Sequence, residues 1–181
     1  MKNPREGLPE HLFKYISSVT PMLNVDLLVF NPEKGVLLSW RKDKFYGPGW
    51  HIPGGIIRFK ENFIDRLNYV AKNEIKINGE LEYRMVSIHQ IMNPSRDVRG
   101  HFISFLFVSE INSKIAENIK INTKNYKSGD LSWHKFSPKN IIPQHIRYSQ
   151  YINKLISNDL NRDIDIGNVL DNYNEEDEKQ Y

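Results

Sequence analysis

The sequence contains no cysteine among its 181 residues. Disulfide bridges and zinc sites built on thiolates are therefore excluded. It also lacks a long apolar run: the longest, "HFISFLFV" at 101–108, is far shorter than the roughly 20 residues of a membrane-spanning helix and is typical of a buried strand. The opening "MKNPREGLPE" has no apolar core of the kind that a signal peptide needs. We therefore expect a soluble, cytoplasmic protein that does not enter a membrane.

Charge is unevenly spread along the chain. Residues 158–181 carry eight acidic and two basic side chains, a net charge of −6, which leaves +9 on residues 1–157 out of the total of +3. The net positive charge of residues 1–157 favours an anionic ligand such as a nucleotide, although the same charge also increases solubility. The lysines are not interleaved with aromatic residues as in an RNA-binding surface, so we expect no nucleic-acid partner.

The pattern of apolar and turn-forming residues predicts one α/β domain over residues 1–157, followed by an acidic C-terminal tail over 158–181 that is flexible or a loosely docked helix. The polar stretch 112–130 is typical of a loop. The expected helices cover 8–18, 61–77 and 144–156, and the expected strands cover 23–30, 35–40, 81–92, 101–111 and 130–136. This order predicts a mixed β-sheet sandwiched between helices.

One acidic residue of the expected helix 61–77 faces the protein interior. On a helical wheel at roughly 100° per residue, Glu74 falls inside the apolar arc, whereas Glu61 falls on the solvent side. An ionised carboxylate that faces inward is costly unless a cation or several hydrogen-bond donors meet it. Glu74 is therefore either a metal ligand or a carboxylate paired with an arginine or with backbone amides.

Two consecutive glycines precede that helix. Gly54 and Gly55 lack a β-carbon, so the backbone at this point is able to pass close to a ligand. Mg²⁺ accepts carboxylate and backbone carbonyl oxygens, keeps several waters and shares substrate phosphates. A glycine loop followed by an inward carboxylate therefore favours a weak Mg²⁺ site that a phosphorylated ligand completes.

These residues resemble the signature box of the Nudix hydrolases. That box consists of a Gly, five residues, a Glu, seven residues, and then Arg-Glu-apolar-x-Glu-Glu-x-Gly-apolar. The matching positions are Gly55, Glu61, Ala71, Glu74 and Ile77, and the positions that differ are Tyr69, Val70, Asn73 and Lys76. The usual cluster of carboxylates is therefore reduced to Glu74.

One branch of the family, the GDP-mannose mannosyl hydrolases, is similar in lacking the first two box glutamates and keeping the last. The similarity covers about residues 8–155 and includes "LFKYISSVTPMLNVDLLVFN" and "LLSWRKDKFYGPGWHIPGG". It implies a Nudix-type fold and a homodimer that cleaves a GDP-mannose-like nucleotide sugar at the sugar carbon, in polysaccharide biosynthesis. It also implies a single Mg²⁺ held by Glu74 and the Gly54 carbonyl, with Asp26 and Arg41 contacting the nucleotide or its phosphates.

The resemblance fails at four positions of that branch's site. Where the branch has a Gln that ligates the metal and a His that acts as general base, this chain has Lys127 and Ser128. Two arginines that face phosphate in the branch are replaced by Ile56 and by Tyr69, which thereby occupies a substrate-binding position. A protonated lysine has no lone pair for a metal. Lys127 would instead supply positive charge at the leaving phosphate.

Four histidines lie near the relevant strands and loops in the sequence and are available as the missing base: His51, His89, His101 and His134. Two residues are the stronger candidates. His101 opens an expected strand and matches a histidine of the branch, and Asp130 matches an acid of the same late loop. Loss of a positioned base costs on the order of 10²–10⁴ in rate. Three functions therefore stay open: a single-Mg²⁺ hydrolase of a nucleoside diphosphate sugar, a nucleotide-sugar-binding protein without turnover, and a hydrolase in which Lys127 replaces the metal charge.

Overall fold

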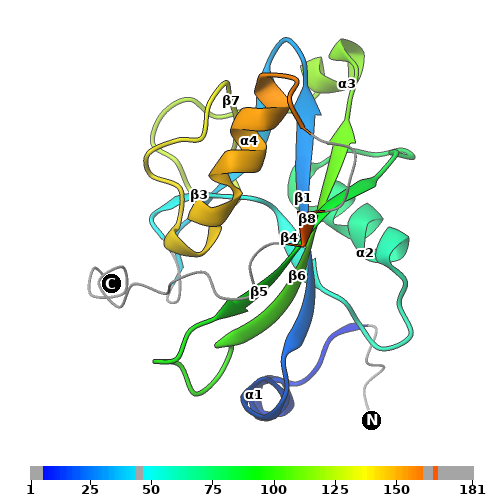
Figure 1. Cartoon of the computed structure of the whole chain (residues 1–181). Coiled ribbons are helices and arrows are strands. Elements are labelled where there is room, and N and C mark those ends of the chain that lie inside the picture. Colours follow the sequence, from blue (N-terminus) through cyan, green and yellow to red (C-terminus); the bar gives the residue numbers. More distant parts are fainter. Residues whose placement is uncertain (1–5, 44–46, 161–164, 167–181) are drawn as a thin grey trace.

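A computed structural model describes residues 6–43, 47–160 and 165–166 (Figure 1). The strands are β1 (Met22–Asn31), β2 (Gly35–Arg41), β3 (Gly49–His51), β4 (Gly54–Ile56), β5 (Arg84–Met92), β6 (His101–Glu110), β7 (Leu131–His134) and β8 (Asp165–Ile166). The helices are α1 (Glu10–Val19), α2 (Phe63–Val70), α3 (Ser113–Glu117) and α4 (Ser149–Ile156), with a π-helical turn η2 (Ala71–Ile75) and a 3-10 turn η3 (Pro143–Tyr148). Within these residues, no helix is long and apolar enough to cross a membrane.

The strands form one mixed sheet in the order β3-β2-β1-β6-β5-β8, with β4 paired to β1 and β7 paired to β2. β1 runs parallel to β6 over its whole length but changes partner on its other side. Its last residues, 29–31, pair with β2, and its residues 24–26 pair with β4. The sheet therefore forks halfway along β1, and this fork is where the candidate site lies.

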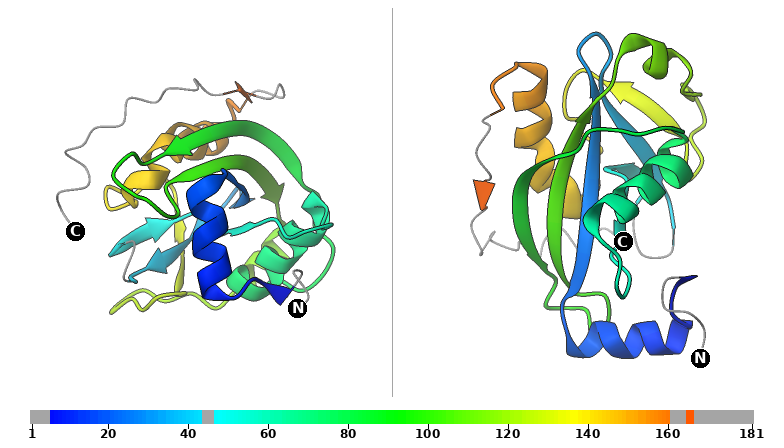
Figure 2. Two further views of the ribbon diagram at one scale, coloured as in Figure 1. Left: turned by 90° about the horizontal axis from the view of Figure 1, so that it is seen from below. Right: turned by 90° about the vertical axis from the view of Figure 1, so that its right-hand side faces the viewer.

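Helices cover both faces of the sheet, with α2 on one side and α4 on the other (Figure 2). The pleat of β1 sends successive side chains to opposite faces, so that Leu27 packs in the core under α2 whereas Leu28 packs in the core under α4. Each fully buried leucine contributes about 1.5–3 kcal/mol. The predicted mixed sheet between helices is confirmed.

The expected helix 61–77 is shorter than the sequence indicated. Asn62 caps it, because its side-chain oxygen accepts a hydrogen bond from the backbone N–H of Asp65 at 2.8 Å, and α2 begins at Phe63. After Val70 the backbone widens into η2, and Lys76 ends it in the left-handed region with φ 65°. π-Helical turns frequently occur at functional sites, and η2 contains Glu74.

Glu61 therefore lies outside the helix, and its predicted position toward solvent is wrong. Its carboxylate turns inward, accepts a hydrogen bond from the backbone N–H of Arg58 at 2.7 Å and pairs with the Arg66 guanidinium at 2.9 Å. The Glu61 side chain is only 13% exposed. This pair ties the glycine loop to the first turns of α2.

Three further segments differ from the expectations. The first half of the expected helix 144–156 is the 3-10 turn η3, and α4 begins only at Ser149. The stretch 112–130, expected as a loop, contains α3, which begins where the Asn112 side chain accepts a hydrogen bond from the backbone N–H of Ile115 at 2.9 Å. In the expected tail, the backbone of Asp165–Ile166 pairs in parallel with β5. The rest of the tail, from residue 161 on, lies outside the described residues.

Candidate functional site

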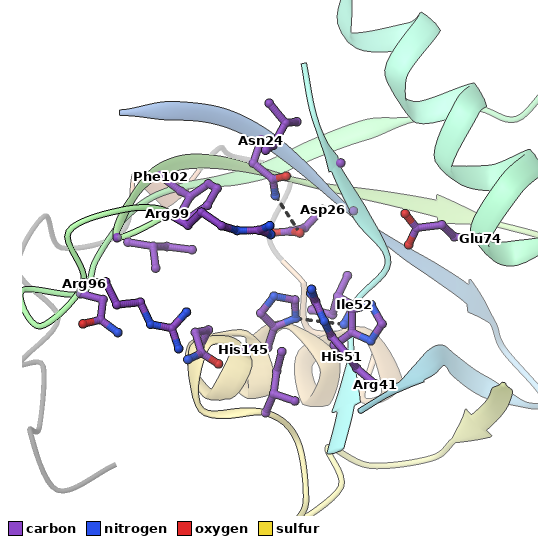
Figure 3. Close-up of a pocket in the computed structure, with 18 residues that line it drawn as sticks. Asn24, Asp26, Arg41, His51, Ile52, Glu74, Arg96, Arg99, Phe102 and His145 are labelled. Atoms are coloured by element: carbon purple, nitrogen blue, oxygen red, sulfur yellow. Dashed lines mark hydrogen bonds between the residues drawn. The ribbon is translucent and has the colours of Figure 1, made fainter. Parts of the chain in front are cut away.

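A cavity of about 340 Å³ opens at the fork of the sheet (Figure 3). Its walls come from β1, β2, β3, β4, η2, the β5–β6 hairpin and η3. The polar side chains in its lining are Asn24, Asp26, Arg41, His51, Glu74, Asn93, Arg96, Arg99, Gln144 and His145. A second cavity, of about 310 Å³, shares Arg41, His51 and Glu74 with the first and also reaches Ser128. The shared residues therefore form the wall between the two cavities.

Gly54 brings its backbone unusually close to β1. A β-carbon at this position would collide with the Asp26 carboxylate and the Val25 carbonyl, so no larger residue fits. The N–H of Leu27 donates to the Pro53 carbonyl at 2.8 Å, and the N–H of Ile57 donates to the carbonyl of Leu23 at 3.0 Å. Because hydrogen-bonded and non-hydrogen-bonded positions alternate in an antiparallel pair, the N–H and carbonyl of Gly54 point away from β1.

Glu74 reaches this glycine from the π-helical turn. Burial raises the pKa of the Glu74 carboxyl to about 7, against the opposing effects of a hydrogen bond from the Gly54 backbone and the positive charge of Arg41. Among the described residues, no basic side chain forms a salt bridge with it. The predicted inward position of Glu74 is confirmed, and a bound cation would stabilise its ionised form.

Asp26 lies in the cavity wall on the other side of Gly54. Its Oδ2 accepts hydrogen bonds from Ser104 Oγ at 2.5 Å and Tyr148 Oη at 2.7 Å, and its Oδ1 accepts one from Asn24 Nδ2 at 3.0 Å. Burial raises the pKa of the Asp26 carboxyl, whereas these three donors lower it. Asp26 thus links β1, β6 and η3 beneath the cavity.

Three arginines give the cavity its positive charge. Arg41 ends β2, and its Nε donates to Asp43 Oδ2 at 2.6 Å. Arg96 and Arg99 come from the β5–β6 hairpin, at the opposite end of the cavity from Glu74 (Figure 3). The backbone N–H of Arg99 donates to Ser17 Oγ at 3.2 Å, which attaches the hairpin to α1. Guanidinium groups at two ends of one cavity suit an elongated anionic ligand.

Two histidines in the lining were not chosen as site residues from the sequence: His51 was one of four histidines considered as a base, and His145 was missed. His51 precedes the glycine loop, and His145 comes from η3, more than ninety positions later; their ring centroids are 6.0 Å apart. The adjacency of His51 to "IPGG" is the sequence signal that favours it over the other three histidines. No local pattern marks His145, Arg96 or Arg99, because the hairpin and η3 reach the cavity through long-range packing.

Two of the predicted catalytic residues belong to a surface turn. Lys127 is exposed, and its backbone N–H donates to Asp130 Oδ2 at 2.6 Å. Asn122 Nδ2 donates to the same oxygen at 2.7 Å. The hydrogen bond from Lys127 and then that from Asn122 lower the pKa of Asp130. Neither residue is part of the lining of the two cavities, so the structure does not bring them together with Glu74.

His101, the third predicted catalytic residue, and Tyr69, a predicted substrate-binding residue, also lie away from the lining of the two cavities. His101 hydrogen-bonds with Gln90, with 2.9 Å between the two Nε2 atoms, and strand alternation places it on the face of β6 opposite to Phe102, which does line the cavity. Tyr69 is 52% exposed and lies against the guanidinium of Arg66, with 4.7 Å between Cζ and the ring centroid.

The residues present fit at most a weakly held metal. Among the described residues, no group of three or more His, Asp and Glu side chains is placed to hold an ion. Glu74 and the outward backbone of Gly54 offer one carboxylate and one carbonyl. Oxygen ligands of this kind suit Mg²⁺ when waters and substrate phosphates complete its shell.

Comparison with known proteins identifies the fold. No family model matches the chain. The low-salt glycan biosynthesis protein Agl8 of Haloferax volcanii is similar to it, with 26% identity over 125 residues that cover 67% of this chain and 77% of that protein.

Solved structures with a similar backbone are Nudix and MutT proteins. A MutT protein from Methanosarcina mazei has a TM-score of 0.55 at 13% identity, covering 76% of this chain and 96% of its own. A Nudix hydrolase from Listeria monocytogenes has a TM-score of 0.55 at 15% identity, covering 78% of this chain and 98% of its own. A bifunctional NMN adenylyltransferase/ADP ribose pyrophosphatase from Francisella tularensis, complexed with AMP and a Mn ion, has a TM-score of 0.54 at 19% identity, covering 82% of this chain and 45% of its own. The chain has the Nudix fold.

Proposed function

We propose that this protein is a Nudix-type hydrolase of a nucleoside diphosphate sugar and that it cleaves the bond between the sugar carbon and the diphosphate. The observation that carries the proposal is the meeting of Glu74, the Gly54 backbone and Arg41 at one end of the cavity. A desolvated carboxylate, an outward-facing carbonyl and a guanidinium group are what a Mg²⁺–diphosphate pair needs from a protein.

Each group at this end has a separate part in the reaction. Glu74 and the Gly54 carbonyl would hold the single Mg²⁺, which when bound supplies positive charge to the leaving diphosphate. Arg41 binds the diphosphate directly, and its hydrogen bond to Asp43 fixes its orientation. Asp26 holds η3 in position through the hydrogen bond from Tyr148 Oη, and its carboxylate lies close against Gly54.

The rest of the cavity supports a nucleotide sugar as the ligand. A volume of about 340 Å³ is within the range of small-molecule sites. The Oε1 atom of Gln144 is buried without a hydrogen-bond partner within the described residues. A hydroxyl or amino group of a ligand would provide the missing donor. The similar protein from Haloferax volcanii is named for glycan biosynthesis, which agrees with a sugar nucleotide such as GDP-mannose.

A second candidate function is nucleotide-sugar binding without turnover. It is favoured by the positions of His101 and Asp130, since neither predicted base belongs to the lining of the cavities. The third possibility, that Lys127 supplies the metal charge, needs its exposed side chain to reach the cavity that Ser128 and Gly129 line. The homodimer that the family resemblance implies stays a prediction.

The test is a product assay with the full chain. Purified protein is incubated with GDP-mannose, GDP-glucose and related nucleotide sugars, with Mg²⁺ or with chelator, and released sugar and GDP are measured. We expect Mg²⁺-dependent release that is lost in Glu74→Gln and kept in the control Glu80→Gln, which changes an exposed carboxylate beyond η2. Calorimetric binding without release supports the second function. Release that resists chelator and is lost in Lys127→Ala supports the third.

A further inference from the structure

The two histidines beside the glycine loop are held in opposite tautomers. Nδ1 of His51 lies 2.8 Å from the carbonyl oxygen of Ser39. A carbonyl only accepts, so Nδ1 of His51 carries the proton. The backbone N–H of Ile52 donates to Nδ1 of His145 at 3.0 Å, so that nitrogen is an acceptor and its ring carries the proton on Nε2. Backbone hydrogen bonds therefore fix both rings.

The neutral His51 ring keeps an unshared electron pair on Nε2. Burial, followed by electrostatic repulsion from the His145 ring and from the Arg41 guanidinium, lowers the pKa of His51 to about 3, so the ring is neutral at physiological pH. Nε2 has no hydrogen-bond partner within the part of the chain that the structure describes. His51 lies in the wall that both cavities share with Glu74 and Arg41. An oriented proton acceptor therefore lies beside the proposed diphosphate position.

The other groups of the cavity that could accept a proton from water, which are its two carboxylates and the second histidine, already have partners or a role. Both oxygens of Asp26 accept hydrogen bonds from neighbouring side chains. Nδ1 of His145 accepts from the backbone of Ile52. Glu74 is assigned to the metal under the proposed function. His51 alone among these four residues combines a fixed tautomer with an unengaged nitrogen acceptor.

We propose that Nε2 of His51 is the general base that activates water for attack on the sugar carbon of the bound nucleotide sugar. This inference rests on the proposed function. A proton moves from water to Nε2 as the water oxygen bonds to the anomeric carbon. The bond from that carbon to the β-phosphate oxygen breaks, and its electron pair stays on the nucleoside diphosphate. The proton returns from Nε2 to solvent after product release.

Substrate binding would increase the proton affinity of His51. The charged or titratable groups that act on the ring are His145, Arg41 and Asp26. A diphosphate beside Arg41 offsets the guanidinium charge, and an opposite charge near an imidazole raises its pKa. His51 would therefore be a weak base in the free protein and a stronger base in the complex.

The first test compares two histidine variants in the product assay. We expect His51→Gln to lower kcat by about 10²–10⁴-fold with KM changed far less, since a base acts in the transition state. His134→Gln is the matched control, because His134 is also a partly buried histidine that contacts Trp50 but does not line either cavity. Added imidazole is expected to restore part of the rate in His51→Ala and to leave His134→Ala unchanged.

The second test does not depend on activity. Long-range ¹H–¹⁵N NMR spectra of the ¹⁵N-labelled full chain at pH 7 report which nitrogen of each ring is protonated. We expect His51 protonated on Nδ1 and His145 protonated on Nε2. A proton on Nε2 of His51 overturns the assignment whatever the protein hydrolyses. Wild-type turnover that persists in His51→Gln also overturns it while leaving the proposed function intact. Absence of turnover in the wild type overturns both.

Discussion

The two ends of the cavity are built in different ways. The end beside Glu74, the local end, comes from Arg41 at the end of β2 and from residues 49–75, in which β3, β4, α2 and η2 follow one another. The opposite, composite end comes from the β5–β6 hairpin, which contributes Arg96 and Arg99, and η3, also distant in sequence, brings His145 to the wall beside the glycine loop. The local end carries the groups suited to metal and diphosphate, and the composite end carries groups suited to recognising the rest of a ligand. Changes at the first should affect the reaction, and changes at the second should affect which ligand binds.

The largest effect is expected from Gly54→Ala at the local end. The added β-carbon meets the Asp26 carboxylate and the Val25 carbonyl, so β4 has to move away from β1. We expect a loss of about 3 kcal/mol in the free energy of unfolding, the upper end for overpacking, together with loss of turnover. Gly55→Ala is the comparison: its β-carbon meets the Arg66 side chain at 3.1 Å, which is able to shift. Urea denaturation checks the difference, and equal losses would contradict it.

A pH-dependent effect is expected from Glu74→Gln in the presence of chelator. Burial raises the pKa of Glu74 from 4.5 to about 7. The folded state therefore binds this proton more tightly than the unfolded state, and the carboxylate destabilises the fold above pH 7. This cost disappears as the pH falls toward 4.5. We expect Glu74→Gln to raise the free energy of unfolding at pH 8 by about 3 kcal/mol and to change it little near pH 4.5.

The measurement is urea denaturation of both proteins at the two pH values. A Glu74→Gln variant that is less stable than the wild type at pH 8 would show that protein groups alone compensate for burial of the ionised Glu74 carboxylate.

A smaller effect, on ligand affinity, is expected at the composite end. Arg96→Ala removes one guanidinium from the cavity wall opposite Glu74. We expect KM for the nucleotide sugar to rise about tenfold, equivalent to about 1.4 kcal/mol, with the Mg²⁺ dependence of kcat unchanged. Arg84→Ala, which changes an exposed arginine of β5, is the control. If Arg96→Ala lowers kcat and leaves KM unchanged, the assignment of the reaction to the local end and of ligand recognition to the composite end is wrong.

The smallest effect is expected from Gln144→Leu. The Gln144 Oε1 atom is buried without a donor within the described residues, so an apolar side chain of similar size removes an unsatisfied acceptor. We expect a gain of about 1 kcal/mol in the free energy of unfolding and a loss of similar size in ligand binding. Thermal unfolding with and without GDP-mannose measures both quantities. A loss of stability without ligand would mean that Gln144 supports the fold and not the ligand.

Local sequence patterns predicted the elements that local interactions determine. The β1–β2 hairpin followed from "NPEKG" between two apolar runs, and the inward position of Glu74 followed from helical periodicity. The end of the helix was wrong, because a π-helical turn and the left-handed Lys76 follow from packing and not from helix propensity. The inward turn of Glu61 was missed since it depends on the pairing of its carboxylate with Arg66.

Sequence patterns did not predict the composite end of the cavity. "NPSRDVRG" was recognised as turn-forming, but nothing in it showed that the hairpin lines the cavity and is attached to α1 through Ser17. The η3 turn brings Tyr148 to Asp26 across 122 positions of the chain. Such contacts are specified by the assembled sheet, so they appear only in the three-dimensional structure.

The proposed function requires that Glu74 and the Gly54 backbone form the metal-assisted end of a nucleotide cavity. Mn²⁺ binding, followed by electron paramagnetic resonance with and without GDP, tests it most directly. We predict that GDP strengthens Mn²⁺ binding to the wild-type protein and that Glu74→Gln weakens this ternary complex by at least about tenfold, while Glu80→Gln does not change it. Equal Mn²⁺ affinity in wild type and Glu74→Gln would contradict the account.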